Sequence, residues 1–128
     1  MNRIRETEDL PVFDWDEKTK TAVFTVSGEL DHYAARGVRE EIDRMISRYR
    51  PRTAVLDLHA VSFMDSAGIG LILGRYDRVS GYGGTLTVRN PTREILKMLN
   101  LAGMERIIRI EINEERKNDD ENKGANGK

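Results

Sequence analysis

The chain has 128 residues, a formal net charge of −1 and no cysteine. This length fits one domain with a single core of ordinary size. The absence of cysteine excludes disulfide scaffolds, thiolate metal sites and thiol catalysis. The nearly balanced charge argues against a nucleic-acid-binding protein that relies on a broad basic surface.

The two ends of the sequence differ in composition from the middle. Residues 1–9 are charged and lack an apolar run, so we expect a flexible N-terminus and not a signal peptide. Residues 113–128 contain one apolar side chain, Ala125, and we expect a disordered charged tail. No apolar stretch approaches the ~20 residues of a membrane-spanning helix. We therefore expect a cytoplasmic protein without membrane contact, whose domain spans residues 10–112.

The first half of the domain predicts a hairpin followed by a helix. A short strand at 12–15 and an alternating, β-branched strand at 21–28 flank the polar link 16–20, which indicates an antiparallel hairpin. An amphipathic helix follows, with Asp31 as its N-cap and Pro51 just beyond its end. Its apolar positions recur every three or four residues: Ala35, Val38, Ile42, Met45, Ile46 and Tyr49.

The second half alternates strands and helices. An apolar strand at 54–58 is typical of a central strand, and a helix is predicted over 66–80. After a strand at 85–88, Asn90-Pro91 predicts a helix that begins with an Asn N-cap and proline at its first position. A final strand is expected at 107–110. This alternation with short links predicts an α/β sheet with right-handed crossovers.

Ser66 lies where the apolar strand gives way to a helix, within the octapeptide Phe-Met-Asp-Ser-Ala-Gly-Ile-Gly at 63–70. The simplest interpretation is that Ser66 is the N-cap of the helix, which contributes about 1 kcal/mol. Ser66, Gly70 and Gly74 are four residues apart and therefore share one stripe of the helix. If this stripe faces outward, it leaves a shallow track beneath the hydroxyl.

Two kinds of enzyme compete for the same residues. A serine-hydrolase elbow needs glycine where Met64 stands, and no spacing marks His32 or His59 as a general base. A dinucleotide-binding turn is also disfavoured, because Gly68, Gly70 and Gly74 are spaced one residue too widely for the usual fingerprint. The same glycines can instead let the helix approach the sheet or a partner closely.

Regulatory phosphorylation is the third interpretation of Ser66. A phosphoserine carries about −1.5 to −2 charges and suits the positive end of a helix dipole. The adjacent Asp65 would repel that charge, so modification could also spoil a surface that prefers a neutral serine. Physical chemistry permits such a switch without selecting it over a cap.

Three motifs, at 28–32, 63–70 and 72–76, closely resemble the anti-anti-sigma factors, which are single STAS domains. The resemblance extends from about residue 12 to about residue 111, and the motif at 72–76 is most similar to the sporulation branch of the family. It implies one α/β STAS domain with a mixed, mostly parallel sheet, helices packed against it and an N-terminal antiparallel hairpin.

The resemblance also implies a function in partner switching. The unphosphorylated protein would bind an anti-sigma factor that is a serine kinase of the GHKL ATPase class, and would thereby release the sporulation sigma factor. Phosphorylation of Ser66 would end this binding, and a PP2C-type phosphatase would restore it. The chain would be a regulatory protein and not an enzyme, monomeric when free and without a cofactor or metal, since ATP and magnesium bind to the kinase.

The partner surface implied by the resemblance surrounds Ser66. Asp65 would lie in it, and Asp31 would contact a basic residue of the kinase, although Asp31 could equally be only an N-cap. Ile69 and Leu73 could belong to the core instead. The remaining contact residues would come from the helix: Gly68, Ile69, Gly70 and Leu73. A general-stress antagonist and a STAS sensor subunit of a larger assembly remain open alternatives.

Overall fold

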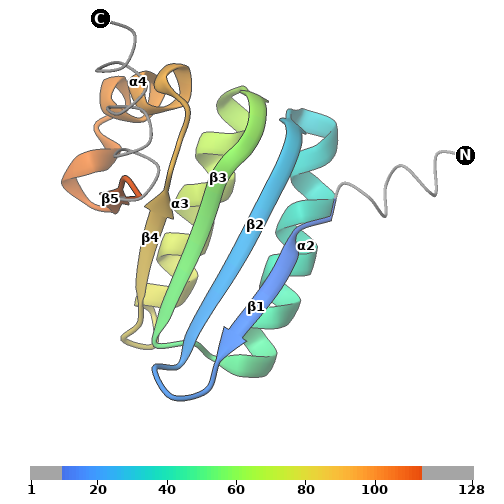
Figure 1. The fold of residues 1–128 in the computed structure, drawn as a ribbon, viewed down its shortest axis with the longest axis vertical. Coiled ribbons are helices and arrows are strands. Elements are labelled where there is room, and N and C mark those ends of the chain that lie inside the picture. Colours follow the sequence, from blue (N-terminus) through green and yellow to red (C-terminus); the bar gives the residue numbers. More distant parts are fainter. Residues whose placement is uncertain (1–9, 114–128) are drawn as a thin grey trace, which may run out of the picture.

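The computed structural model describes residues 10–113, so the expectations for the two terminal segments lie outside the described residues. The described part forms a five-stranded sheet in the order β1-β2-β3-β4-β5 (Figure 1). The first pair is antiparallel and the other pairs are parallel, which confirms the predicted hairpin and mixed sheet. The strands are β1 (Val12–Asp16), β2 (Thr21–Leu30), β3 (Thr53–Met64), β4 (Thr85–Arg89) and β5 (Arg109–Glu111).

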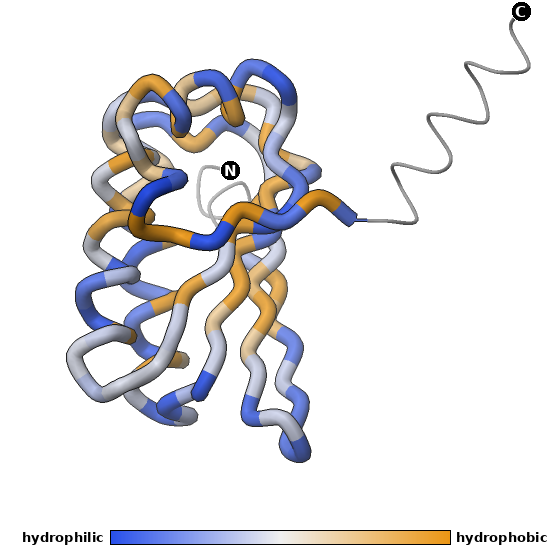
Figure 2. Tube along the Cα trace, turned by 90° about the vertical axis from the view of Figure 1, so that its left-hand side faces the viewer, coloured by the Kyte–Doolittle hydropathy of each residue, from blue (hydrophilic) through white to orange (hydrophobic). Residues whose placement is uncertain are grey.

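Two long helices, α2 (His32–Tyr49) and α3 (Ser66–Ser80), lie side by side against one face of the sheet. Figure 2 shows the strands edge-on, with these helices on one side of them. A short helix α4 (Arg93–Leu101) and a 3-10 turn η1 (Met104–Arg106) connect β4 to β5. Among residues 10–113, no helix has the length and apolarity needed to cross a membrane.

The core lies between the sheet and the two long helices. Its largest fully buried side chains include Phe24, Leu56 and Ile72. The hairpin is joined to the end of α2 by aromatic contacts, with ring centroids 4.9 Å apart for both Phe13–Tyr49 and Trp15–Tyr49. The periodic apolar residues of α2 face the core as predicted, because the helical repeat places them on one stripe of the helix.

Strand β3 is longer than predicted, since it continues past Leu58 to Met64. Its polar positions obscure the strand in the sequence, because Asp57, His59 and Ser62 interrupt the apolar run. The register with β2 shifts twice along this extension, and Gly28 has a φ of +81°, which favours glycine. The extension matters for the site because it brings the ends of β2 and β3 level.

The prediction for the start of the last helix was wrong. Thr92, not Asn90, is the N-cap of α4, and its hydroxyl accepts a hydrogen bond from the N–H of Ile95 at 3.3 Å. Asn90 instead adopts a left-handed φ of +56°, and its N–H donates to the carbonyl of Glu111 at 2.8 Å. Asn90 thus fastens the end of β4 to the end of β5. The last strand also begins later than predicted, at Arg109, because η1 precedes it.

Candidate functional site

The two aspartates of the sequence motifs, Asp31 and Asp65, lie at one edge of the sheet. Leu30 and Met64 are register partners at the ends of the parallel strands β2 and β3. Asp31 and Asp65 follow them directly and precede α2 and α3. The carboxyl ends of neighbouring parallel strands share an edge, so this register places two helix N-termini beside each other at the upper end of the sheet in Figure 1.

Both aspartates are N-caps. The carboxylate of Asp31 accepts a hydrogen bond from the N–H of Ala34 at 3.0 Å, and that of Asp65 accepts one from the N–H of Ala67 at 2.9 Å. The predicted cap at Asp31 is confirmed, whereas the simplest interpretation of Ser66 was wrong. Ser66 is the first residue of α3, is exposed, and its hydroxyl has no hydrogen-bond partner within residues 10–113. The aspartate thus caps the helix and leaves the hydroxyl facing solvent.

This arrangement changes the electrostatics expected of a phosphate on Ser66. The Asp65 carboxylate already accepts an N–H of the first turn, which is where an anion is stabilised at a helix N-terminus. A phosphate on the adjacent residue would add negative charge beside a carboxylate that is held in place by its hydrogen bond. Modification at Ser66 would therefore produce a strongly acidic surface patch.

Helix α3 presents two different faces near its start. Gly68 is buried, and a Cβ atom added to it would lie 2.1 Å from Cγ of Met64, so it allows close contact with the end of β3. Gly70 is exposed, and an added Cβ there would meet nothing within 4 Å. Gly74 is half-buried, and an added Cβ there would also meet nothing within 4 Å. The stripe of Ser66, Gly70 and Gly74 thus faces outward, as the sequence allowed.

The other predicted contact residues divide between surface and core. Leu73 is exposed, with 39% of its surface accessible, whereas Ile69 is half-buried and packs against the core. Gly68 is buried against Met64, so the structure gives it a packing role. Asp31 and Asp65 are half-buried behind their capping hydrogen bonds. Both glycines 68 and 70 lie within α3, so no glycine-rich turn precedes this helix.

Two exposed aromatic residues at this edge were missed by the sequence analysis. Tyr33, the second residue of α2, is 89% accessible, and Phe63, one residue before the end of β3, is 50% accessible. Large apolar side chains at exposed positions beside polar motifs often mark binding surfaces. A signal was available in the sequence: Phe63 adjoins the Asp65-Ser66 motif, and Tyr33 is out of phase with the buried stripe of α2.

A groove of about 750 Å³ runs between α2 and α3. Arg75, which the sequence analysis did not select, is buried in its wall and forms an ion pair with Asp43, with 2.8 Å between Nε and Oδ1. Burial lowers the pKa of Arg75, and Asp43 opposes this effect. The lining residues are His32, Tyr33, Ala35, Arg36, Arg39, Ala67, Gly70, Leu71, Gly74 and Arg75.

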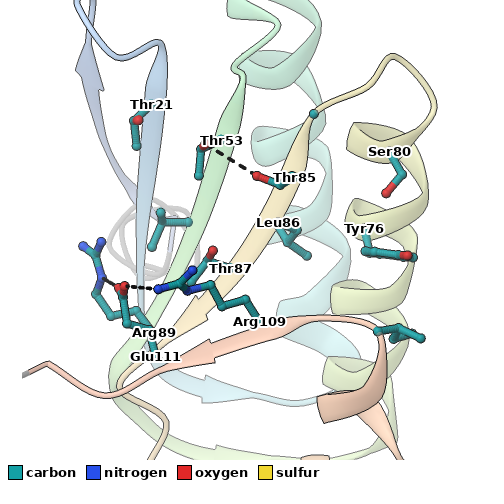
Figure 3. Close-up of a pocket in the computed structure, with 13 residues that line it drawn as sticks. Thr21, Thr53, Tyr76, Ser80, Thr85, Leu86, Thr87, Arg89, Arg109 and Glu111 are labelled. Atoms are coloured by element: carbon teal, nitrogen blue, oxygen red, sulfur yellow. Dashed lines mark hydrogen bonds and ion pairs between the residues drawn. The ribbon is translucent and has the colours of Figure 1, made fainter.

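A second hollow, of about 620 Å³, lies away from Ser66 around the start of β4. Figure 3 shows Thr21, Thr53 and Thr85 on three neighbouring strands at one end of this hollow, and the Arg89–Glu111 ion pair, with 2.9 Å between Nε and Oε1, farther along the strands. No residue of the 63–70 motif lines it. No cluster of three or more metal-ligating side chains occurs in the described part of the chain.

The fold and this edge can be compared with known proteins. The STAS domain family matches residues 13–116. An anti-sigma F factor antagonist of Paenibacillus polymyxa is 37% identical over 92 residues, which covers 72% of this chain and 79% of the relative. An anti-sigma F factor antagonist of Lysinibacillus sphaericus is 34% identical over 66% of this chain and 73% of its own length.

Solved structures agree with these relatives. The anti-sigma factor antagonist SpoIIAA in its unphosphorylated form superposes with a TM-score of 0.65 at 26% identity, covering 89% of this chain and 98% of that one. The Bacillus cell fate determinant SpoIIAA in its phosphorylated form gives a TM-score of 0.62 at 29% identity, covering 84% and 97%. The sheet order, the matching family and these relatives lead to one conclusion: the chain belongs to the STAS domain family, among its anti-sigma factor antagonists.

Proposed function

We propose that the unphosphorylated chain binds an anti-sigma factor that is a serine kinase, and thereby frees a sporulation sigma factor. Ser66 is the phosphoacceptor, and a PP2C-type phosphatase reverses its modification. The observation that carries this proposal is the exposed hydroxyl of Ser66 at the first position of α3, beside a neighbouring carboxylate that caps the helix. Structures of SpoIIAA in an unphosphorylated form and in a phosphorylated form support this proposal.

The switch follows from the charge at this edge. Without phosphate, Ser66 is neutral and small, and a partner can approach the exposed stripe that continues to Gly70. With phosphate, about −1.5 to −2 charges are added next to Asp65. A partner surface that approaches the neutral form closely then has to desolvate or displace that charge, which weakens binding.

We propose that the docking surface comprises the carboxyl edge of the sheet and the first two turns of α3. Asp31 would contact a basic group of the kinase without giving up its capping hydrogen bond, because a carboxylate has several acceptor positions. The exposed aromatic side chains at the same edge would supply apolar contact area. The proposed contact residues are Asp31, Tyr33, Phe63, Asp65, Ser66, Ile69, Gly70 and Leu73.

A general-stress antagonist is the second candidate, since the anti-sigma-B factor antagonist of Bacillus subtilis is 29% identical over 66% of this chain. The higher identity to the anti-sigma F factor antagonists favours the sporulation branch. Binding to each type of anti-sigma factor, measured pairwise, separates the two. In either case we propose that the protein acts in the cytoplasm as a monomer when free.

The decisive experiment is phosphorylation by the cognate anti-sigma factor with Mg-ATP, followed by mapping of the modified residue. We expect one phosphate per chain, located on Ser66, and none on the Ser66→Ala variant. Ser62 and Ser80 are exposed and lie on either side of Ser66, so Ser62→Ala and Ser80→Ala are matched controls that should be phosphorylated normally. Phosphate on any residue other than Ser66 would contradict the assignment.

A further inference from the structure

The groove between α2 and α3 combines positive charge with very small side chains. Arg36 and Arg39 line it from α2, and Arg75 lines it from α3. On the side of α3 the lining is otherwise mostly small, and an added Cβ would meet nothing at two of these positions. These small lining residues are Ala67, Gly70 and Gly74. A partner segment can therefore approach the backbone of α3 closely while it lies beside the arginines.

Arg75 is an incompletely satisfied charge in the wall of this groove. Only 8% of its side chain is accessible, and its Nε lies 2.8 Å from Oδ1 of Asp43. The contact is an ion pair but does not have the geometry of a hydrogen bond: within residues 10–113, Nε and Nη1 of Arg75 and Oδ1 of Asp43 have no hydrogen-bond partner. Buried donors without partners are rare in folded proteins and call for a physical reason.

The charges around the groove do not balance. Asp43 forms ion pairs with two arginines, because Nε of Arg78 lies 3.6 Å from Oδ1 of Asp43, the same oxygen that contacts Arg75. Arg39 is exposed and has no ion-pair partner among the described residues. Arg36 faces Glu40 at 3.4 Å, and both side chains are largely exposed, so this pair neutralises little. The groove therefore has an excess of positive charge.

Repulsion within this group of arginines is consistent with that excess. Burial has the largest influence on the pKa of Arg75 and lowers it, Asp43 raises it, and Arg39 and Arg78 lower it further. A guanidinium group stays protonated in proteins, so the charge of Arg75 persists: its buried Nε and Nη1 act on an anion in the groove through their field, and the exposed Arg36 and Arg39 can contact it directly. Carboxylates are suitable anions because guanidinium groups can bind them with two parallel hydrogen bonds.

We propose that the α2–α3 groove binds an acidic segment of the anti-sigma factor, with one carboxylate placed among Arg36, Arg39 and Arg75. The groove is continuous with the proposed docking surface, because Gly70 belongs to both and Ala67 follows Ser66 directly. Its volume of about 750 Å³ has room for several side chains. The inference rests on the proposed function only for the identity of the partner.

The docking surface then has an acidic region near the helix N-termini and a basic region farther along the helices. Asp31 and Asp65 form an acidic end beside Ser66, and the arginines form a basic wall along the following turns of α2, which carries Arg36 and Arg39, and of α3, which carries Arg75. Asp31 and Arg39 are about 12 Å apart along α2, and Asp65 and Arg75 about 15 Å apart along α3, at ~1.5 Å per residue. A partner that fits must therefore present a basic group and an acidic group roughly two to three helical turns apart, which fixes its orientation.

The first test measures the affinity for the purified anti-sigma factor at two salt concentrations. Arg39→Glu reverses an exposed charge in the groove, and Arg48→Glu is the matched control, an exposed arginine of the same helix outside it. We expect Arg39→Glu to weaken binding about tenfold at low salt and less at high salt, whereas Arg48→Glu has little effect. If the wild-type chain binds and the two variants bind equally well, the proposal is overturned while the proposed function stands.

The second test uses the free chain and does not depend on the anti-sigma factor. Octaglutamate is titrated into the labelled protein, and amide NMR shifts are followed. We expect shifts centred on Ala67, Gly70 and Gly74, lost in Arg39→Glu and retained in Arg48→Glu. Shifts that are absent, or that survive in Arg39→Glu, overturn the proposal. Equal shifts with inorganic phosphate at the same charge concentration overturn it too, because the groove would then be a site for small anions.

Discussion

The N-termini of α2 and α3 are nearly equivalent in backbone structure but differ in chemistry. Each helix follows a parallel strand, and each is capped by an aspartate that accepts from the N–H two or three residues ahead. The first helical residue is His32 in α2 and Ser66 in α3, and the third is Ala34 and Gly68, respectively. Only α3 therefore offers an aliphatic hydroxyl group at its first position, and only α3 has a glycine packed against the sheet in its first turn.

This difference shows how one structural motif can serve two purposes. Each capping aspartate accepts a hydrogen bond from an N–H group of the first turn, because the first N–H groups of any helix lack partners within the helix. Because Asp65 caps α3, the hydroxyl of Ser66 is not needed as the cap and can face a partner. Gly68 then fixes how closely α3 approaches Met64 and hence where the hydroxyl is held. The following variants test each part of this comparison.

Replacement of Gly68 should have the largest effect. A Cβ atom at this position overlaps Cγ and Sδ of Met64, at 2.1 and 2.6 Å, so Gly68→Ala should destabilise the fold by ~1–3 kcal/mol. Gly70→Ala is the matched control in the same helix, where the added methyl group meets nothing. It should stabilise the protein by ~0.5–1 kcal/mol through helix propensity. Urea unfolding of both variants measures the difference, and equal stabilities would disprove the close-packing role of Gly68.

A negative charge should weaken partner binding more at the N-terminus of α3 than at the N-terminus of α2. Ser66→Asp places a carboxylate beside Asp65 at the proposed contact, and we expect the affinity for the anti-sigma factor to fall by at least about tenfold, or ~1.4 kcal/mol. His32→Asp introduces the same side chain at the equivalent position of α2 and should cause a smaller loss. Calorimetric titration of both variants provides the measurement. Equal losses would indicate that general acidity, and not the position of Ser66, controls binding.

The cap and the charge of Asp65 can be separated with two substitutions. Asp65→Ala removes the hydrogen bond to Ala67 and should cost about 1 kcal/mol of stability. Asp65→Asn keeps a capping side chain and should cost less, while it removes the negative charge. Thermal unfolding compares the pair, and the same two substitutions at Asp31 should behave alike. If Asp65→Asn is as unstable as Asp65→Ala, the carboxylate acts through its charge and not as a hydrogen-bond acceptor.

The far end of α3 should affect stability slightly and binding not at all. The hydroxyl of Tyr82 donates to the carbonyl of Pro51 at 2.9 Å, and burial raises the pKa of Tyr82 while Arg50 and Arg78 oppose the increase. The folded state thus prefers the protonated phenol. This contribution is complete below the ordinary pKa of about 10 and is lost as the pH rises through the raised value.

Tyr82→Phe should accordingly lose up to ~1 kcal/mol at neutral pH and show a weaker decrease in stability at alkaline pH than the wild type. Its affinity for the anti-sigma factor should be unchanged, because Tyr82 lies beyond the C-terminal end of α3, whereas Ser66 is the first residue of that helix. Unfolding from pH 7 to pH 11 and one binding measurement check both expectations. A loss of binding in this variant would show that the docking surface includes more residues than we propose and extends to Tyr82.

Most of the regular structure could be predicted from periodicity. Helix α3 has the predicted bounds, and the cap of α2 is Asp31 as predicted, because local signals decide both. The two errors in helix capping occurred where a local signal had two solutions. Asp65 and Ser66 are both good caps, and so are Asn90 and Thr92. In each pair the choice depends on where the preceding strand ends, which is set by its pairing with neighbouring strands.

The alternation of strands and helices, the apolar stripes that build the core and the motif that carries Ser66 can all be predicted from the amino-acid sequence. These features depend on interactions within a few residues, so a single sequence contains them. Three features required the folded structure: Ser66 is exposed and does not cap its helix, Gly68 packs while Gly70 faces outward, and Arg36, Arg39 and Arg75 share one groove. These depend on the register of β2 with β3 and on the packing of α2 against α3, which bring together residues that are distant in the chain.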